Sequence, residues 1–135
     1  MSGEVVKTET IGIIITHGDL AEVLKRTVEL IVGTVEGVYP LSGSDLCNED
    51  IIGEIRKLIT DDGKRRAILF VDYFGGSCCI NSVRAVEGVP GVKVISGVNL
   101  PVLLDFVTKR GTMDFDTMVD HLIRRGRESV RVIDF

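Results

Sequence analysis

Residues 11–33, IGIIITHGDLAEVLKRTVELIVG, have the pattern of a buried strand followed by an amphipathic helix. Ile11–Ile15 form a dense apolar run, which is typical of a strand buried on both faces of a parallel sheet. After a short polar turn, apolar side chains recur at the three- and four-residue spacing of an amphipathic helix. Asp19 and Glu22 have the spacing of a capping box, which predicts that this helix begins just after His17.

The same alternation of strand and helix patterns continues to the end of the chain. The expected strands cover residues 11–15, 35–41, 67–71, 92–95 and 130–133. The expected helices run from just after His17 to Gly33, from the N-cap Asn48 to Ile59, from the N-cap Ser77 to Val86, from Pro101 to near Gly111, and from Phe115 to Ile123. Strands separated by helices predict right-handed crossovers, and therefore a doubly wound α/β fold: a mostly parallel sheet with helices on both faces.

Size and composition fit one globular domain. The chain has 135 residues, of which 44% are apolar and 27% charged, so it can bury a core and is not of the disordered class. A net charge of -4 without a basic stripe argues against a nucleic-acid partner. We expect residues 1–10 to be a polar extension and residues 11–135 to be the domain.

The chain carries no pattern of secretion or membrane insertion. Its start is polar rather than a signal peptide, and no apolar run approaches the ~20 residues of a membrane span. The three cysteines, Cys47, Cys78 and Cys79, do not suit a disulfide framework. The sequence therefore predicts a cytoplasmic protein with reduced thiols and no direct membrane insertion.

His17 is the first candidate for chemistry, because sites in open parallel sheets form beyond the carboxyl ends of the strands. Imidazole is a good phosphoryl acceptor near neutral pH, where much of it is neutral. Gly18 would let a phosphoryl group approach the backbone, and the following helix N-terminus would stabilise its charge. The alternative is a loop histidine without a role.

Asp72 ends the third expected strand, at the same edge of the sheet as His17. A carboxylate there would accept the Nδ1 proton of the histidine and leave Nε2 free as a nucleophile. Gly75, Gly76 and Ser77 then enter a helix, and they would form an anion cradle of backbone amides and one hydroxyl. The alternatives are a solvated turn and an ordinary serine cap. No lysine follows in the pattern of a nucleotide P-loop, and nothing indicates a cofactor or an essential metal.

Two further residue types invite a functional interpretation. Cys78 and Cys79 fall in the first turn of a helix, where a thiol pKa is lowered and a catalytic thiol is conceivable. The alternative, which we favour, is that they are small residues filling a buried helix start. We expect His121, the second histidine of the chain, to lie at the surface.

Four motifs in order resemble the mannose-family IIA domains of the sugar phosphotransferase system (PTS). They are the opening stretch quoted above, LFVDYFGGS (residues 69–77), VISGVNLPVLLD (94–105) and GRESVRVI (126–133). The resemblance covers the chain from about Ile11 to its end. It departs from the family at Cys78 and Cys79, where proline and phenylalanine commonly follow the glycine motif.

The resemblance implies a four-stranded parallel sheet and a fifth, antiparallel edge strand that is exchanged between the subunits of a homodimer. It implies that His17 carries the phosphoryl group, that Asp72 orients His17, and that Ser77 is a phosphate ligand. The implied donor is the phosphorylated carrier protein HPr. The implied acceptor is a separate IIB protein, through which the chain would associate with a IIC/IID permease.

Three alternatives share parts of this pattern. One is a regulatory module that senses phosphorylation without sugar transport, and another is the IIA-like subunit of dihydroxyacetone phosphorylation. The third is a receiver-like domain phosphorylated on Asp72. Receivers need acidic residues at the end of the first strand to bind magnesium, whereas this chain has Thr16 and His17 there.

Overall fold

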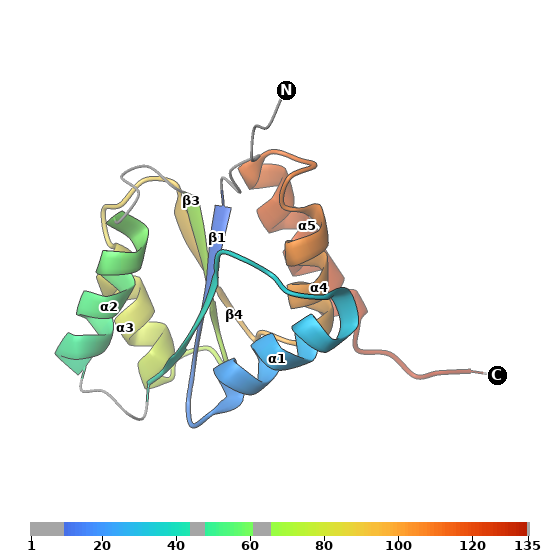
Figure 1. The fold of residues 1–135 in the computed structure, drawn as a ribbon, viewed down its shortest axis with the longest axis horizontal. Coiled ribbons are helices and arrows are strands. Elements are labelled where there is room, and N and C mark those ends of the chain that lie inside the picture. The colour runs from blue at the N-terminus through green and yellow to red at the C-terminus, as the bar shows by residue number, and fades with distance from the viewer. Residues whose placement is uncertain (1–9, 44–47, 61–65, 135) are drawn as a thin grey trace.

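The computed structural model describes residues 10–43, 48–60 and 66–134, and these form one sheet between two layers of helices (Figure 1). The four strands in these ranges are β1 (Thr10–Thr16), β2 (Val38–Ser42), β3 (Arg66–Val71) and β4 (Val92–Ser96). The helices are α1 (Leu20–Val32), α2 (Asn48–Thr60), α3 (Ser77–Val86), α4 (Leu100–Lys109) and α5 (Phe115–Glu128). The predicted doubly wound α/β fold with a parallel sheet is confirmed.

The strand order, β2-β1-β3-β4, places the two most apolar strands at the centre of the sheet. All of the pairings are parallel, and every residue of β1 is buried, as its apolar run predicts. The register pairs Ile15 of β1 with Val71 of β3. The residues that follow these two strands, including His17 and Asp72, therefore emerge side by side at one edge of the sheet.

The two faces of the sheet carry separate halves of the core. Ile11, Ile13 and Ile15 pack with α2 and α3, whereas Ile14 packs on the other face with α1, α4 and α5 (Figure 1). This division follows from the alternation of side chains along a strand.

Two helices begin differently from the sequence prediction. Asp19 is the N-cap of α1 but makes no side-chain capping bond. The N–H of Ala21 donates instead to Oγ1 of the buried Thr16, at 2.8 Å. The N-cap of α3 is Gly76, so Ser77 is the first helical residue and its hydroxyl is directed elsewhere.

The cap expected at Asn48 is also different. Asn48 is already the first residue of α2, and its side-chain oxygen accepts a hydrogen bond from the Asn81 side chain in α3, at 3.0 Å. Cys47 and residues 1–9 lie outside the described part of the chain.

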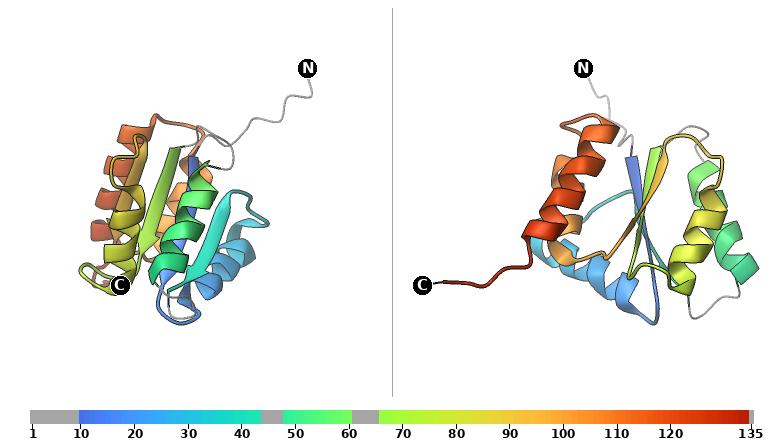
Figure 2. Two further views of the ribbon diagram at one scale, coloured as in Figure 1. Left: turned by 90° about the vertical axis from the view of Figure 1, so that its left-hand side faces the viewer. Right: turned by 180° about the vertical axis from the view of Figure 1, so that it is seen from behind.

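The C-terminal segment is the largest departure from the expected elements. α5 continues to Glu128 rather than ending at Ile123. Residues 131–134 form no strand within this single chain and run away from the body (Figure 2). Val130, Val132 and Ile133 are 83%, 84% and 70% exposed. The expected fifth strand is therefore not present among the residues that the structure describes.

Among the described residues, no helix has both the length and the apolar character needed to cross a membrane.

Candidate functional site

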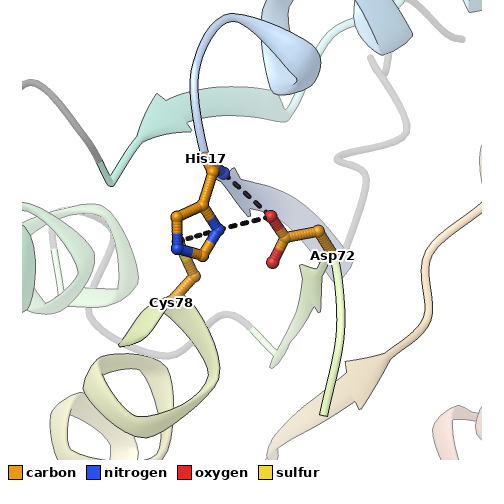
Figure 3. Close-up of side chains that lie close together, drawn as sticks. All are labelled: His17, Asp72 and Cys78. Carbon is orange, nitrogen blue, oxygen red and sulfur yellow. Dashed lines mark hydrogen bonds and ion pairs between the residues drawn. The ribbon is translucent and has the colours of Figure 1, made fainter. Parts of the chain in front are cut away.

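His17 and Asp72 meet at the carboxyl edge of the sheet, where the sequence predicts them. His17 follows the last residue of β1, and Asp72 follows the last residue of β3. The Nδ1 atom of His17 lies 2.7 Å from Oδ2 of Asp72, and the backbone N–H of His17 donates to the same oxygen at 2.9 Å (Figure 3). Asp72 is thus bound both to the ring and to the backbone of His17.

This pairing determines which ring nitrogen is available for chemistry. A carboxylate only accepts hydrogen bonds, so Nδ1 carries the proton and Nε2 keeps its lone pair. Nε2 lies 3.1 Å from Oγ of Ser77, the first residue of α3. The free nitrogen is therefore directed at the N-terminus of a helix, which favours negative charge.

Asp72 keeps its negative charge in this environment. Partial burial raises the pKa of its carboxyl group, but the hydrogen bonds from His17 and its charge, with a further bond from the N–H of Tyr73, outweigh burial and lower that pKa below its ordinary value. The carboxylate is thus ionised at neutral pH and can stabilise positive charge on the imidazole.

The glycines expected to bind phosphate are Gly18, next to His17, and the two glycines of the predicted anion cradle, Gly75 and Gly76. Gly18 and Gly75 have positive φ angles, +60° and +86°, which few other residues adopt at low cost. Gly76 has an extended backbone, but a Cβ atom there would lie 2.6 Å from the ring of Tyr73. Gly75 and Gly76 form the turn between β3 and α3, and the next residue, Ser77, brings its Oγ atom to 3.1 Å from Nε2.

The sequence reasoning missed Tyr73. Its ring stacks on the imidazole of His17, with centroids 5.5 Å apart and planes inclined by 25°. The signal available in the sequence was its place directly after Asp72. Tyr73 thus lies over one face of the imidazole, while the residue itself remains more than half exposed.

The sequence reasoning also missed that Cys78 touches the site. Its Sγ atom lies 3.7 Å from Nδ1 of His17, and the residue is only 1% exposed. Burial and the nearby charge of Asp72 raise the pKa of the thiol to about 11. That direction is opposite to the lowering expected at a helix start, because burial outweighs the helix N-terminus here. Cys79 is also buried, which favours a packing role for both thiols.

His17, Asp72 and Cys78 also form a group of potential metal ligands, with one ligand atom from each lying within 4.8 Å of the others. Imidazole, carboxylate and thiolate are ligands that zinc accepts.

His121, expected at the surface, is half-buried in the structure. Its Nε2 atom lies 2.7 Å from Oδ2 of Asp105 in α4, and its side chain is 22% exposed. Arg125 approaches the same carboxylate oxygen at 3.6 Å. The pair joins α4 to α5.

Comparison with known proteins places this geometry in a family. A family model described as "EIIA-man: PTS system fructose IIA component" matches residues 12–123. The mannose-specific EIIAB component of Escherichia coli K12 is 33% identical over an alignment of 131 residues that covers 92% of this chain. The chain spans about 40% of the length of that relative.

Two further proteins match this chain over most of their own length as well. The sorbose-specific EIIA component of Lacticaseibacillus casei is 26% identical over 83% of this chain and 82% of its own length. The solved mannose/sorbose-specific IIA subunit of Enterococcus faecalis shares the fold with a TM-score of 0.84, at 20% identity, over 94% of this chain and 96% of its own. Because the family model spans most of the sequence, the chain belongs to the EIIA-man family, the mannose-type IIA components of the sugar phosphotransferase system.

Proposed function

We propose that the protein is a phosphoryl carrier of a mannose-family PTS, which accepts a phosphoryl group from phospho-HPr on Nε2 of His17 and passes it to a separate IIB protein. The observation that carries the proposal is the 2.7 Å contact between Nδ1 of His17 and Asp72, which leaves Nε2 unprotonated and directed at the N-terminus of α3. Family membership supports the same role.

The chemistry is an in-line exchange between two histidines. Nε2 of His17 attacks the phosphorus atom, a new N–P bond forms, and the bond from phosphorus to the donor histidine of HPr breaks, which returns its electron pair to that imidazole. The ring of His17 gains positive charge as the bond forms, and the Asp72 carboxylate stabilises it through the Nδ1 proton. The Ser77 hydroxyl and the amides at the start of α3 are placed to donate to the phosphoryl oxygens. Transfer to IIB runs the same step in reverse.

The surroundings of His17 suit a protein partner. His17 itself has a side chain that is 42% exposed, so the ring can be reached from solvent. Phe74, two residues after Asp72, is 84% exposed, and Leu20 at the start of α1 is 41% exposed. Large apolar side chains at the rim of a polar site are typical of docking surfaces. The proposal therefore places HPr and IIB on this edge of the sheet, in turn. Both partners imply a cytoplasmic location, with residues 11–135 as the IIA domain.

The proposal includes a homodimer built on the C-terminal residues. β4 is an edge strand, and a hollow of about 420 Å³ lies beside it, lined by residues of β4, α4 and α5. Exposed apolar side chains at Val130, Val132 and Ile133 would be buried if this segment paired with β4 of a second copy. Such an exchange supplies the fifth, antiparallel strand that the single chain lacks.

The test of the carrier role is transfer of label from radioactive phospho-HPr. The wild-type chain is expected to take up one phosphoryl group in a linkage that is labile in acid and stable in alkali, as a phosphohistidine is. His17→Ala should abolish labelling. The matched control is His121→Ala, because His121 is the only other histidine of the chain and is also paired with a carboxylate at 2.7 Å. Retention of label by His17→Ala, or its loss in His121→Ala, would refute the assignment.

A further inference from the structure

The side chains of Asp72 and Cys78 both lie next to the imidazole of His17 (Figure 3). The three residues come from separate places in the fold: His17 follows β1, Asp72 follows β3, and Cys78 lies in the first turn of α3. Nδ1 lies 2.7 Å from Oδ2 of Asp72 and 3.7 Å from Sγ of Cys78, and the three ligand atoms are all within 4.8 Å of one another. The proposed carrier chemistry gives roles to His17 and Asp72 but none to Cys78.

Two of the three separations between these atoms can be compared directly with those in a tetrahedral metal site. Zinc bonds of about 2.0–2.3 Å hold neighbouring ligand atoms about 3.3–3.6 Å apart. The observed separation between Sγ and Nδ1, 3.7 Å, is within about 0.1 Å of this range. The separation between Nδ1 and Oδ2 must widen by about 0.6 Å, as a hydrogen bond gives way to two metal bonds. His17 can make this movement because its side chain is 42% exposed.

We propose that His17, Asp72 and Cys78 bind a zinc-class divalent cation through Nδ1, a carboxylate oxygen and Sγ, and that the bound ion prevents phosphorylation of His17. The inhibitory part rests on the proposed function of His17, whereas the binding part does not. One imidazole nitrogen, one carboxylate and one thiolate leave the fourth position to water, as in zinc sites with three protein ligands. The thiolate provides the softness that favours zinc over magnesium or calcium.

The inhibition follows from the tautomer of the imidazole. In the free protein the proton sits on Nδ1 and Nε2 holds the lone pair that attacks phosphorus. A cation on Nδ1 needs the lone pair of that nitrogen, so the ring proton moves to Nε2 through solvent and the thiol proton of Cys78 leaves to the buffer. Nε2 then has no lone pair for attack, and Asp72 is engaged by the metal. Metal and phosphoryl group thus require opposite states of one ring and exclude each other, each weakening the binding of the other.

The chain supplies a matched pair of cysteines for the test. Cys78 and Cys79 are neighbours in the same helical turn and both are buried, but only Cys78 belongs to the ligand group. The full chain, kept reduced with a non-chelating phosphine, is titrated with Co²⁺ and the thiolate-to-cobalt absorption is followed. Zn²⁺ affinity is then measured by displacement of Co²⁺. Circular dichroism checks that each variant is folded.

The expected result is one ion per chain, with a thiolate band in the wild type and in Cys79→Ser. Cys78→Ser and Cys78→Ala should lose the band and weaken Zn²⁺ binding by at least about 10-fold, since even the loss of outer contacts to a metal ligand costs that much. Equal Zn²⁺ affinity in the wild type and both Cys78 variants would overturn the site. So would a loss in Cys79→Ser as large as that in Cys78→Ser.

Labelling by phospho-HPr then tests the inhibition separately. Each variant is labelled with and without Zn²⁺, and its rate is compared with its own metal-free rate. Zn²⁺ at a concentration that saturates the wild type should slow the wild type and Cys79→Ser but not Cys78→Ser. Equal slowing of all three would overturn the inhibitory part. If the metal-free wild type takes up no label but still forms the thiolate band, the proposed function fails and the metal site stands.

Discussion

Replacing Asp72 with asparagine tests the pairing on which the proposed chemistry depends. In the structure, Oδ2 of Asp72 accepts from Nδ1 and from the backbone N–H of His17, and Oδ1 accepts from the N–H of Tyr73. Both oxygens are thus used as acceptors. Asparagine has only one oxygen, so its NH₂ group must face a donor on one side. If that side is His17, the ring proton moves to Nε2, and the nucleophile is lost.

The magnitude can be worked from these contacts. Removing a preorganised electrostatic group from a developing charge costs about 2.7–4 kcal/mol in the transition state. A neutral hydrogen bond from the asparagine oxygen to Nδ1 recovers about 1 kcal/mol in the orientation that still serves His17. The remaining loss, about 2–3 kcal/mol, corresponds to a rate lower by roughly 10²-fold, because each 1.36 kcal/mol is tenfold.

The assay is rapid-quench transfer of label from phospho-HPr, with circular dichroism to show that the fold is intact. Asp105→Asn is the matched control, because Asp105 also accepts from a histidine at 2.7 Å but lies in α4, away from His17. Asp105→Asn should transfer at the wild-type rate. A wild-type rate for Asp72→Asn would contradict a role for Asp72 in transfer, because neither its charge nor the tautomer that it sets on His17 would then matter.

Three other outcomes are expected. Ser77→Ala should slow transfer by about tenfold, the cost of one hydrogen bond to a charged group, and an unchanged rapid-quench rate would remove Ser77 from the phosphate ligands. Burial and Asp72 raise the pKa of the Cys78 thiol from 9.0 to about 11, so iodoacetamide should alkylate Cys78 at least about 100-fold more slowly at pH 8 than it alkylates a free thiol. The rate, followed by peptide mass spectrometry, should increase as pH rises toward 11. Rapid alkylation at pH 8 would contradict the burial of this thiol. A chain ending at Ser129, which keeps α5 whole, should be monomeric by light scattering at micromolar concentration while the full chain is dimeric; tight dimers of the shorter chain, or a monomeric full chain, would refute the exchanged strand.

The sheet and the pairing at its edge were predictable, because both follow from local patterns. The run of isoleucines in β1 needs burial on two faces, and a parallel sheet brings the residues after β1 and β3 to one edge. The sequence places His17 and Asp72 there without any knowledge of distances.

What could not be predicted depends on contacts between distant residues. The capping-box spacing of Asp19 and Glu22 is present, but Asp19 makes no side-chain capping bond. The Thr16 hydroxyl accepts from the N–H of Ala21 instead, because the end of β1 lies next to the start of α1. The position of Ser77 at a helix start predicts that it is the N-cap. In the structure Gly76 is the N-cap, and the Ser77 hydroxyl lies beside Nε2 of His17. The rise in the pKa of the Cys78 thiol likewise comes from burial, which no short motif encodes.

Thr16 has a consequence for the speed of the proposed relay. Its carbonyl accepts from the N–H of Gly43 and its hydroxyl accepts from the N–H of Ala21, both at 2.8 Å, so the residue before the histidine is anchored to two other segments. The backbone at His17 is therefore already in its working position before any partner arrives. A carrier that is loaded and unloaded many times gains from this arrangement, because neither direction of transfer has to wait for the loop to order. The rate of transfer is then set by the chemical step and by the association of the two proteins.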